Sequence, residues 1–191
     1  MRNRRDVLRS AKHEAGHALL FLLFGCEFDS IEIKENVAND YDMSTLSFGK
    51  VAVGVVRGGV GCIGHHEEVI VHMAGIAGER VDRQRPGKFG FTDVLSGAEA
   101  DWRAARAICT PEYLAGFGQT GMNEDQYLSA ALANAHSLIV QFKDAHTAMV
   151  NALVEKRVLT YDECRALTRS ALESAPVSVS LPSAPRASAS R

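Results

Sequence analysis

Apolar residues near the start of the chain recur at helical spacing, from Val7 to Leu23. This spacing predicts an amphipathic helix over residues 7–24, with Gly25 as its C-terminal stop. Two strands are predicted next. Residues 30–34 alternate between apolar and polar side chains, and residues 49–56 are rich in β-branched valine. We therefore expect one small β-sheet near the N-terminus.

The rest of the chain is predicted to be helical. Helical spacing covers residues 65–81, 96–109, 124–155 and 162–172, with a break expected inside 124–155. Ser96 and Glu99 have the spacing of a capping box, and Pro111 ends the helix that they begin. Because strands do not alternate with helices, the pattern predicts an α+β fold that is mainly α-helical. We expect one domain over residues 1–173 and a disordered tail, rich in Ser, Ala and Pro, over 174–191.

Charge, hydropathy and cysteine spacing narrow the class of protein. The 191 residues carry a formal net charge of −2, which argues against a nucleic-acid partner because phosphate binding needs an excess of Lys and Arg. The apolar run at 18–24 is too short to span a bilayer, and the polar residues Lys12, His13 and Glu14 before it argue against a signal peptide. The four cysteines are widely spread, as expected of reduced thiols. We expect a cytoplasmic protein with no membrane partner.

Residues 13–17 read His-Glu-Ala-Gly-His, the pattern H-E-x-x-H. Two imidazoles four residues apart share one helix face, where both can bind one zinc ion. Zinc lowers the pKa of a water molecule, and a glutamate beside the first ligand can take the proton of that water. The motif therefore predicts His13 and His17 as metal ligands and Glu14 as the catalytic base. The alternative is a helix with two ordinary core or surface histidines.

A catalytic zinc site needs a third protein ligand. The candidates are the acidic and histidine side chains that follow, namely His65, His66, Glu67, Glu68, His72, Glu79, Asp93, Glu99 and Asp101. Spacing alone does not choose among them. The run at 65–68 is better explained as a polar helix start than as a second metal site, since adjacent residues face different sides of a helix. Tyr113, Tyr127 and Tyr161 could each donate to an oxyanion, and the pattern selects none of them.

Four segments together resemble the peptidase domain of the FtsH family, the ATP-dependent zinc metalloproteases. They are His-Glu-Ala-Gly-His-Ala-Leu at 13–19, Met-Ala-Gly-Ile-Ala-Gly-Glu at 73–79, Ser-Gly-Ala-Glu-Ala-Asp-Trp-Arg-Ala-Ala-Arg-Ala at 96–107, and the closing helices at 148–167. The resemblance implies a zincin-like fold and gives Asp101 the role of third zinc ligand. It also places Glu79 where the family has a glutamate, which could orient a histidine ligand or be a solvated helix residue.

The chain departs from the family in several places. Ile76 stands where the family usually has arginine, and Trp102 stands where it usually has leucine. The sequence contains neither a G-x-x-x-x-G-K-[ST] phosphate loop nor an apolar stretch long enough for a transmembrane helix. We therefore expect a stand-alone relative of the peptidase half that lacks the AAA ATPase module.

The expected function is that of a zinc metallopeptidase, an endopeptidase that hydrolyses flexible or unfolded polypeptides. The sequence leaves open a separate ATPase or adaptor partner and a homo-oligomer. Two other interpretations are a catalytically inactive binding or regulatory module that keeps the zinc site, and a structural zinc closed by four protein ligands. The strand predicted at 49–56 would either pair with an extended substrate or belong to the core.

Overall fold

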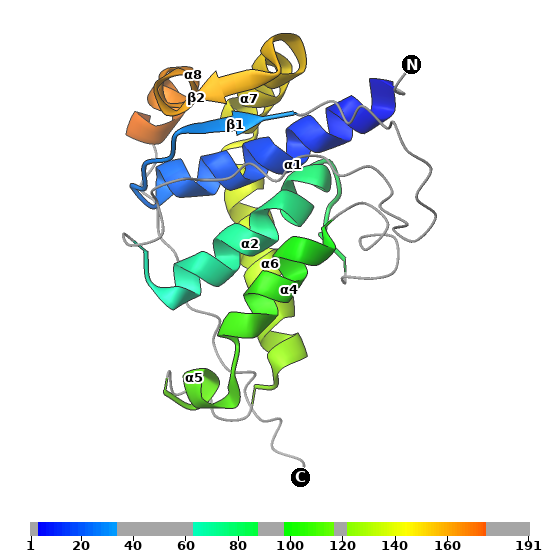
Figure 1. Cartoon of the computed structure of the whole chain (residues 1–191), viewed down its shortest axis with the longest axis vertical. Helices are drawn as coiled ribbons and strands as arrows, with labels where there is room; N and C mark the ends of the chain where they lie inside the picture. The colour runs from blue at the N-terminus through cyan, green and yellow to red at the C-terminus, as the bar shows by residue number, and fades with distance from the viewer. Residues whose placement is uncertain (1–3, 34–62, 88–97, 117–121, 175–191) are drawn as a thin grey trace, which may run out of the picture.

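The protein is mainly helical, with one small two-stranded sheet (Figure 1). The computed structural model describes residues 4–33, 63–87, 98–116 and 122–174. In chain order the elements are α1 (Arg4–Leu23), β1 (Ser30–Glu32), α2 (His65–Glu79), α4 (Glu99–Ile108), α5 (Pro111–Gly116), α6 (Glu124–Gln141), α7 (Lys143–Lys156), β2 (Val158–Thr160) and α8 (Tyr161–Ser174). The predicted class, α+β and mainly α-helical, is confirmed. The tail predicted over 174–191 lies almost wholly outside the described residues.

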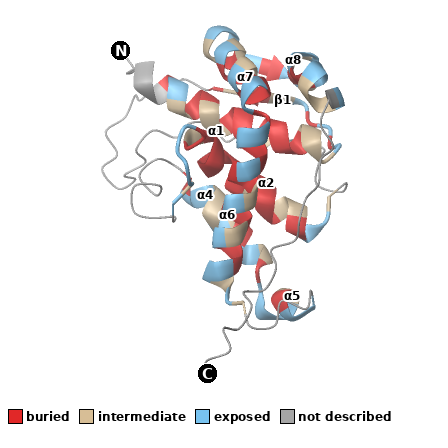
Figure 2. Cartoon of the chain, turned by 180° about the vertical axis from the view of Figure 1, so that it is seen from behind, coloured by how far each residue is buried: buried red, intermediate tan, exposed pale blue. Residues whose placement is uncertain are grey.

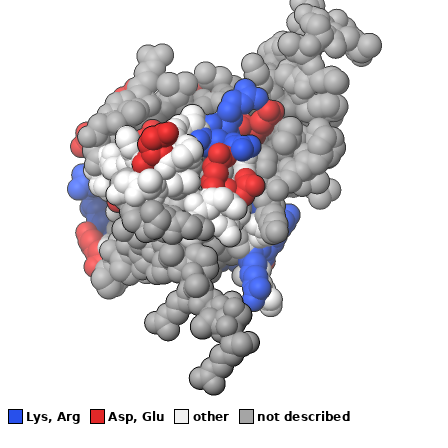
Figure 3. Space-filling view, turned by 90° about the horizontal axis from the view of Figure 1, so that it is seen from below, with Lys and Arg blue, Asp and Glu red and all other residues white. Residues whose placement is uncertain are grey.

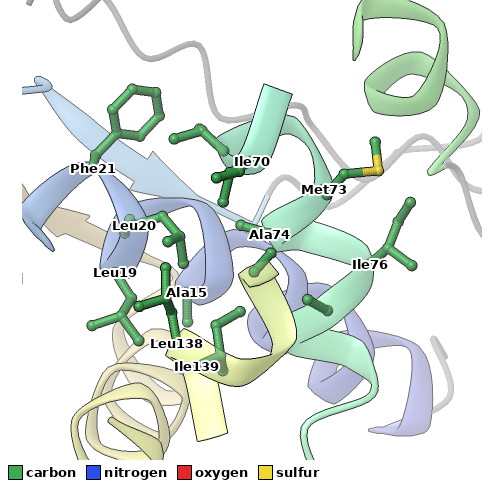
Figure 4. Close-up of a cluster of buried hydrophobic side chains, with 14 of the residues drawn as sticks. Ala15, Leu19, Leu20, Phe21, Ile70, Met73, Ala74, Ile76, Leu138 and Ile139 are labelled. Carbon is green, nitrogen blue, oxygen red and sulfur yellow. The ribbon is translucent and has the colours of Figure 1, made fainter. Parts of the chain in front are cut away.

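Helices α1 and α2 form the centre of the core. Buried positions gather on these two helices (Figure 2), and Figure 4 shows Leu19 of α1 and Ala74 of α2 in one cluster with Ile139 of α6. Every residue of α2 from Val69 to Gly78 is buried except His72. A helix that is apolar on most sides is expected to be enclosed by neighbours. Here α1, α4 and α6 pack around α2.

Two glycines allow the backbones of α1 and α2 to approach closely. A β-carbon on Gly16 would lie 2.3 Å from the carbonyl oxygen of Ala74, and one on Gly78 would lie 2.3 Å from the carbonyl oxygen of Lys12. A side chain at either position would therefore force the helices apart. This close crossing brings the face of α1 that carries the H-E-x-x-H motif directly against α2.

Helix α1 ends as predicted, at Gly25. This glycine has a φ of +73°, a left-handed conformation that costs other residues free energy. Its N–H donates to the carbonyl of Leu22, and the N–H of Cys26 donates to the carbonyl of Phe21. These two hydrogen bonds form a Schellman motif, which satisfies carbonyls left unpaired at the end of the helix.

The two-stranded sheet pairs a segment that follows α1 with a segment that precedes α8. Strands β1 and β2 are antiparallel, with Ile31 opposite Leu159, and both side chains are fully buried. The small sheet predicted near the N-terminus therefore contains β1, which the sequence predicted, and among the described residues its other strand is β2, which it did not. Strand β2 has only three residues and lies between two helices, so its sequence pattern is too short to predict a strand. The strand predicted at 49–56 lies outside the described residues.

The later helices differ from prediction at their ends. Helix α4 begins after Ala98, two residues later than predicted, and Ser96 of the predicted capping box lies outside the described residues. Pro111 starts the short helix α5 and does not merely end α4, because proline fits the first position of a helix. A capping box is instead present at Asn123 and Gln126, before α6. The break expected within 124–155 occurs at Phe142.

The cysteines only partly fit the expectation of reduced thiols. Cys109 and Cys164 are free and buried. Cys26 is disulfide-bonded, which corrects that expectation for this residue, and its partner lies outside the described residues. Distance along the chain did not reveal this bond, because folding can bring distant cysteines together. Within the described part of the chain, no helix combines the length and apolar character needed to cross a membrane.

Candidate metal centre

Helix α1 places His13 and His17 one turn apart on the face that meets α2. Their Nε2 atoms lie 3.1 Å from each other, and the two rings meet edge to face. Both side chains are largely enclosed, with 13% of each exposed. The i, i+4 spacing explains why the rings are neighbours, and the close crossing of α1 and α2 explains why they are shielded from water.

Asp101 reaches the same point from the start of α4. Its Oδ2 atom lies 2.8 Å from Nε2 of His13 and 3.4 Å from Nε2 of His17. One ligand atom from each of the three residues lies within 4.8 Å of the others. Two ligands of a tetrahedral zinc, each bound at about 2.0–2.2 Å, are separated by about 3.3–3.6 Å. The separation of Asp101 from His17, 3.4 Å, falls in this range, and the separations of 2.8 Å and 3.1 Å are a few tenths of an ångström shorter. The donor set of two imidazoles and one carboxylate is one that zinc accepts.

The other ring nitrogen of each histidine has an acceptor on α2. Nδ1 of His13 lies 2.8 Å from Oε1 of Glu79, and Nδ1 of His17 lies 2.8 Å from the carbonyl oxygen of Val71. Acceptors at both places favour a proton on Nδ1, which leaves the Nε2 lone pairs directed at the common point. Of the two sequence-based interpretations of Glu79, the contact with His13 favours orientation of a ligand.

Gly75 provides the space in which the two rings meet. A β-carbon at this position would lie 2.4 Å from Nε2 of His13 and 2.6 Å from Nε2 of His17. Any larger residue would therefore displace both nitrogens. Sequence reasoning did not assign a role to Gly75 or to the Val71 carbonyl. The glycines of the segment at 73–79 were the available signal for close packing, but a backbone acceptor leaves no trace in residue type.

The charges at this point depend on one another. Burial lowers the pKa of His13, but its hydrogen bonds to Asp101 and Glu79 and the charges of Asp101 and Glu14 raise that pKa well above 6.5. Burial also lowers the pKa of His17, but the charge of Asp101 and its hydrogen bond to His17 raise this pKa by more, so the net shift is upward. Burial would raise the pKa of Asp101, but the two imidazoles hold it well below its usual range. A cation shared by these three side chains would be strongly favoured.

Glu14 lies on the same helix, directly after His13. Only 3% of the residue is exposed, and its negative charge raises the pKa of both imidazoles. In helices that carry H-E-x-x-H, the glutamate directly after the first histidine is the residue that can act as a base on a metal-bound water.

Three of the other candidate ligands make their contacts away from His13 and His17. His66 contacts Tyr127 through a 2.6 Å hydrogen bond at the start of α2, and the ring of His65 packs on Tyr113. Glu99 pairs with Arg103 on the exposed face of α4. Asp93 lies outside the described residues. Of the candidate third ligands among the described residues, only Asp101 forms with His13 and His17 a group whose ligand atoms all lie within 4.8 Å of one another.

The outer surface offers no comparable concentration of one charge on the face seen from below. Acidic and basic side chains lie beside one another there, among uncharged residues (Figure 3).

Comparison with known proteins adds no assignment. No protein-family model matches the chain, and no curated protein matches it. The case for a function therefore depends on the geometry of the site and on the resemblance of its motifs.

Proposed function

We propose that this protein is a zinc-dependent metallopeptidase that cleaves internal peptide bonds of flexible or unfolded polypeptides. One observation carries the proposal: His13, His17 and Asp101 converge from two helices with their ligand atoms at separations suited to one zinc ion. Three protein ligands leave a coordination position for water, as in catalytic sites, whereas a structural site uses four.

Each residue of the site would have a distinct role. His13, His17 and Asp101 would hold the zinc, which when bound supplies a Lewis acid that acidifies water and polarises a carbonyl group. Glu14 would accept a proton from the attacking water and donate it to the departing amine. Glu79 and the Val71 carbonyl would hold the two imidazoles in the tautomer that leaves Nε2 free to bind.

The arrangement also supports the finer fold assignment that the sequence motifs implied. A helix that carries H-E-x-x-H, a glycine-rich helix that ends in Glu79 and a later helix with Asp101 in its first turn occur in this order along the chain, as the motifs do in the FtsH peptidase domain. We propose a zincin-like fold of that type. Ile76 is buried in the core, so an arginine could not replace it here without an unpaired buried charge.

Metal analysis combined with proteolysis of denatured casein tests the proposal. Wild-type protein should bind one zinc per chain and degrade casein. Glu14→Gln should keep the zinc and lose hydrolysis, while His17→Ala should lose both. His65→Ala is the matched control, because His65 is an exposed histidine on α2. Full activity of Glu14→Gln would refute the mechanism.

A zinc-containing wild-type protein that leaves casein intact would instead support the alternative function, an inactive binding or regulatory module. The departure from the family at Ile76 is the observation that favours this alternative. In either case the partner is a polypeptide, with a separate ATPase or adaptor and a homo-oligomer as further proposals.

A further inference from the structure

One histidine beside the metal centre has no role so far. Among the described residues, the histidines away from the centre are mostly engaged by hydrogen bonds. His66 contacts Tyr127, His136 donates to the carbonyl of Arg80, and His146 donates to the carbonyl of Lys12. No hydrogen bond of the described structure engages the ring of His72. It is also the one residue of α2 between Val69 and Gly78 that is not buried.

The position of His72 on α2 places it at the edge of the centre. It directly follows Val71, whose carbonyl oxygen accepts the hydrogen bond from His17. It precedes Gly75 by three residues, and residues at i and i+3 share a helix face. Gly75 is the point of α2 that the Nε2 atoms of His13 and His17 approach. His72 therefore lies one turn before Gly75, on the face of α2 that His13 and His17 approach.

The electrostatic surroundings of His72 agree with this placement. Burial lowers its pKa, the charge of His17 lowers it further, and the charges of Asp101 and Glu68 oppose that shift. Two of the three predicted metal ligands are thus close enough to act on this ring. A neutral imidazole carries one N–H group, which can donate to an oxygen acceptor.

The tyrosines that the sequence left open as oxyanion donors are placed elsewhere. The hydroxyl of Tyr127 contacts His66, and the hydroxyl of Tyr113 lies 3.3 Å from that of Tyr127. Tyr161 packs edge to face on Phe28, beside the sheet. None of these contacts involves a residue of the metal centre.

We propose that His72 contacts the substrate, donating an N–H hydrogen bond to the oxygen of the scissile carbonyl as that oxygen gains negative charge. This inference rests on the proposed peptidase function. A donor placed at a developing oxyanion stabilises the transition state more than the bound substrate, so its loss is expected to reduce kcat more than it changes KM.

The test is direct binding of a phosphinic peptide, in which a tetrahedral phosphinate replaces the scissile amide, to zinc-loaded protein. His72→Ala should weaken this binding by up to about 10² to 10³, the factor by which kcat falls when one oxyanion donor is removed. It should leave the zinc content and the binding of acetohydroxamate unchanged. His72→Gln keeps an N–H donor and should recover part of the affinity, and His65→Ala should bind as the wild type does.

Each outcome bears on the inference. Equal binding of the phosphinic peptide by His72→Ala and wild type would overturn it, as would a loss of zinc in both His72 variants, which would indicate a role in the metal site itself. Absence of phosphinic-peptide binding by the zinc-loaded wild type would overturn it as well. Binding that depends on His72, in a wild-type protein that hydrolyses no peptide, would support the contact and refute the peptidase proposal separately.

Discussion

Glu79, the last residue of α2, accepts a hydrogen bond from Nδ1 of His13 at 2.8 Å, across the crossing of α1 and α2. Both side chains are largely buried, with 13% of His13 and 14% of Glu79 exposed. The contact holds the His13 ring so that its Nε2 atom faces Asp101. A carboxylate in this place both orients a histidine ligand and makes it more basic.

Removal of the Glu79 carboxylate should weaken zinc binding without abolishing it. In Glu79→Ala we expect the zinc dissociation constant to rise by about 10- to 100-fold, the usual cost of losing such a partner. Glu79→Gln keeps an oxygen acceptor and should fall between this variant and the wild type. Competition with a chromogenic chelator measures these constants. Glu155→Ala, an exposed site on α7, is the control, and an effect of equal size there would contradict the orienting role.

Loss of the Asp101 carboxylate should be more severe. Because an orienting partner alone costs up to about 100-fold, removing a direct ligand in Asp101→Ala should raise the zinc dissociation constant by more than about 100-fold. Metal analysis after gel filtration would show the loss. Glu99→Ala removes a carboxylate from the exposed side of the same helix and should keep the metal. Retention of zinc by Asp101→Ala would rule out the proposed ligand set.

Substitution of Gly75 should change the affinity for zinc without a matching change in the free energy of unfolding. A methyl group there would meet the ring atoms of His13 and His17 at 2.4–2.6 Å, so the rings must move. Gly75→Ala should therefore lower zinc affinity. The unfolding free energy of the metal-free variant should change little, because alanine is more favourable than glycine inside a helix by about 1 kcal/mol. Isothermal titration with zinc and urea unfolding of the metal-free protein measure the two effects.

Gly16→Ala is the complementary variant. Its methyl group would meet the backbone carbonyl of Ala74 at 2.3 Å, and backbone cannot rotate aside as a ring can. We expect a loss of about 1–3 kcal/mol in unfolding free energy, partly offset by helix propensity. A Tm equal to that of the wild type would mean that the α1–α2 crossing tolerates a wider separation.

The pH dependence of stability should reveal the ion pairs that join α1 to α7. Hydrogen bonds from Lys12 and Lys143 lower the pKa of Asp82 to about 2. A depressed carboxyl pKa means that the stabilisation is present above the unfolded value of 3.8 and is lost as the pH falls toward 2. The difference in unfolding free energy between wild type and Asp82→Asn should thus shrink between these pH values. A difference independent of pH would exclude this origin.

Features encoded within a turn or two of helix could be predicted from residue types alone. The H-E-x-x-H spacing places His13 and His17 on one face, and Gly25 ends α1 because its φ is positive. These features depend on near neighbours along the chain, so residue types and their spacing are enough to predict them.

The distant groups that complete the site could be identified only once the packing of the helices was known. Asp101 is 88 positions from His13, and the carbonyl of Val71 has no residue-specific pattern at all. Motif resemblance pointed to Asp101, but its distance from the two imidazoles depends on how closely α1 and α2 cross. Gly16 and Gly78 set that separation through backbone contacts. Periodicity specifies the face that a helix buries, whereas the partner and the depth of contact arise from packing between helices.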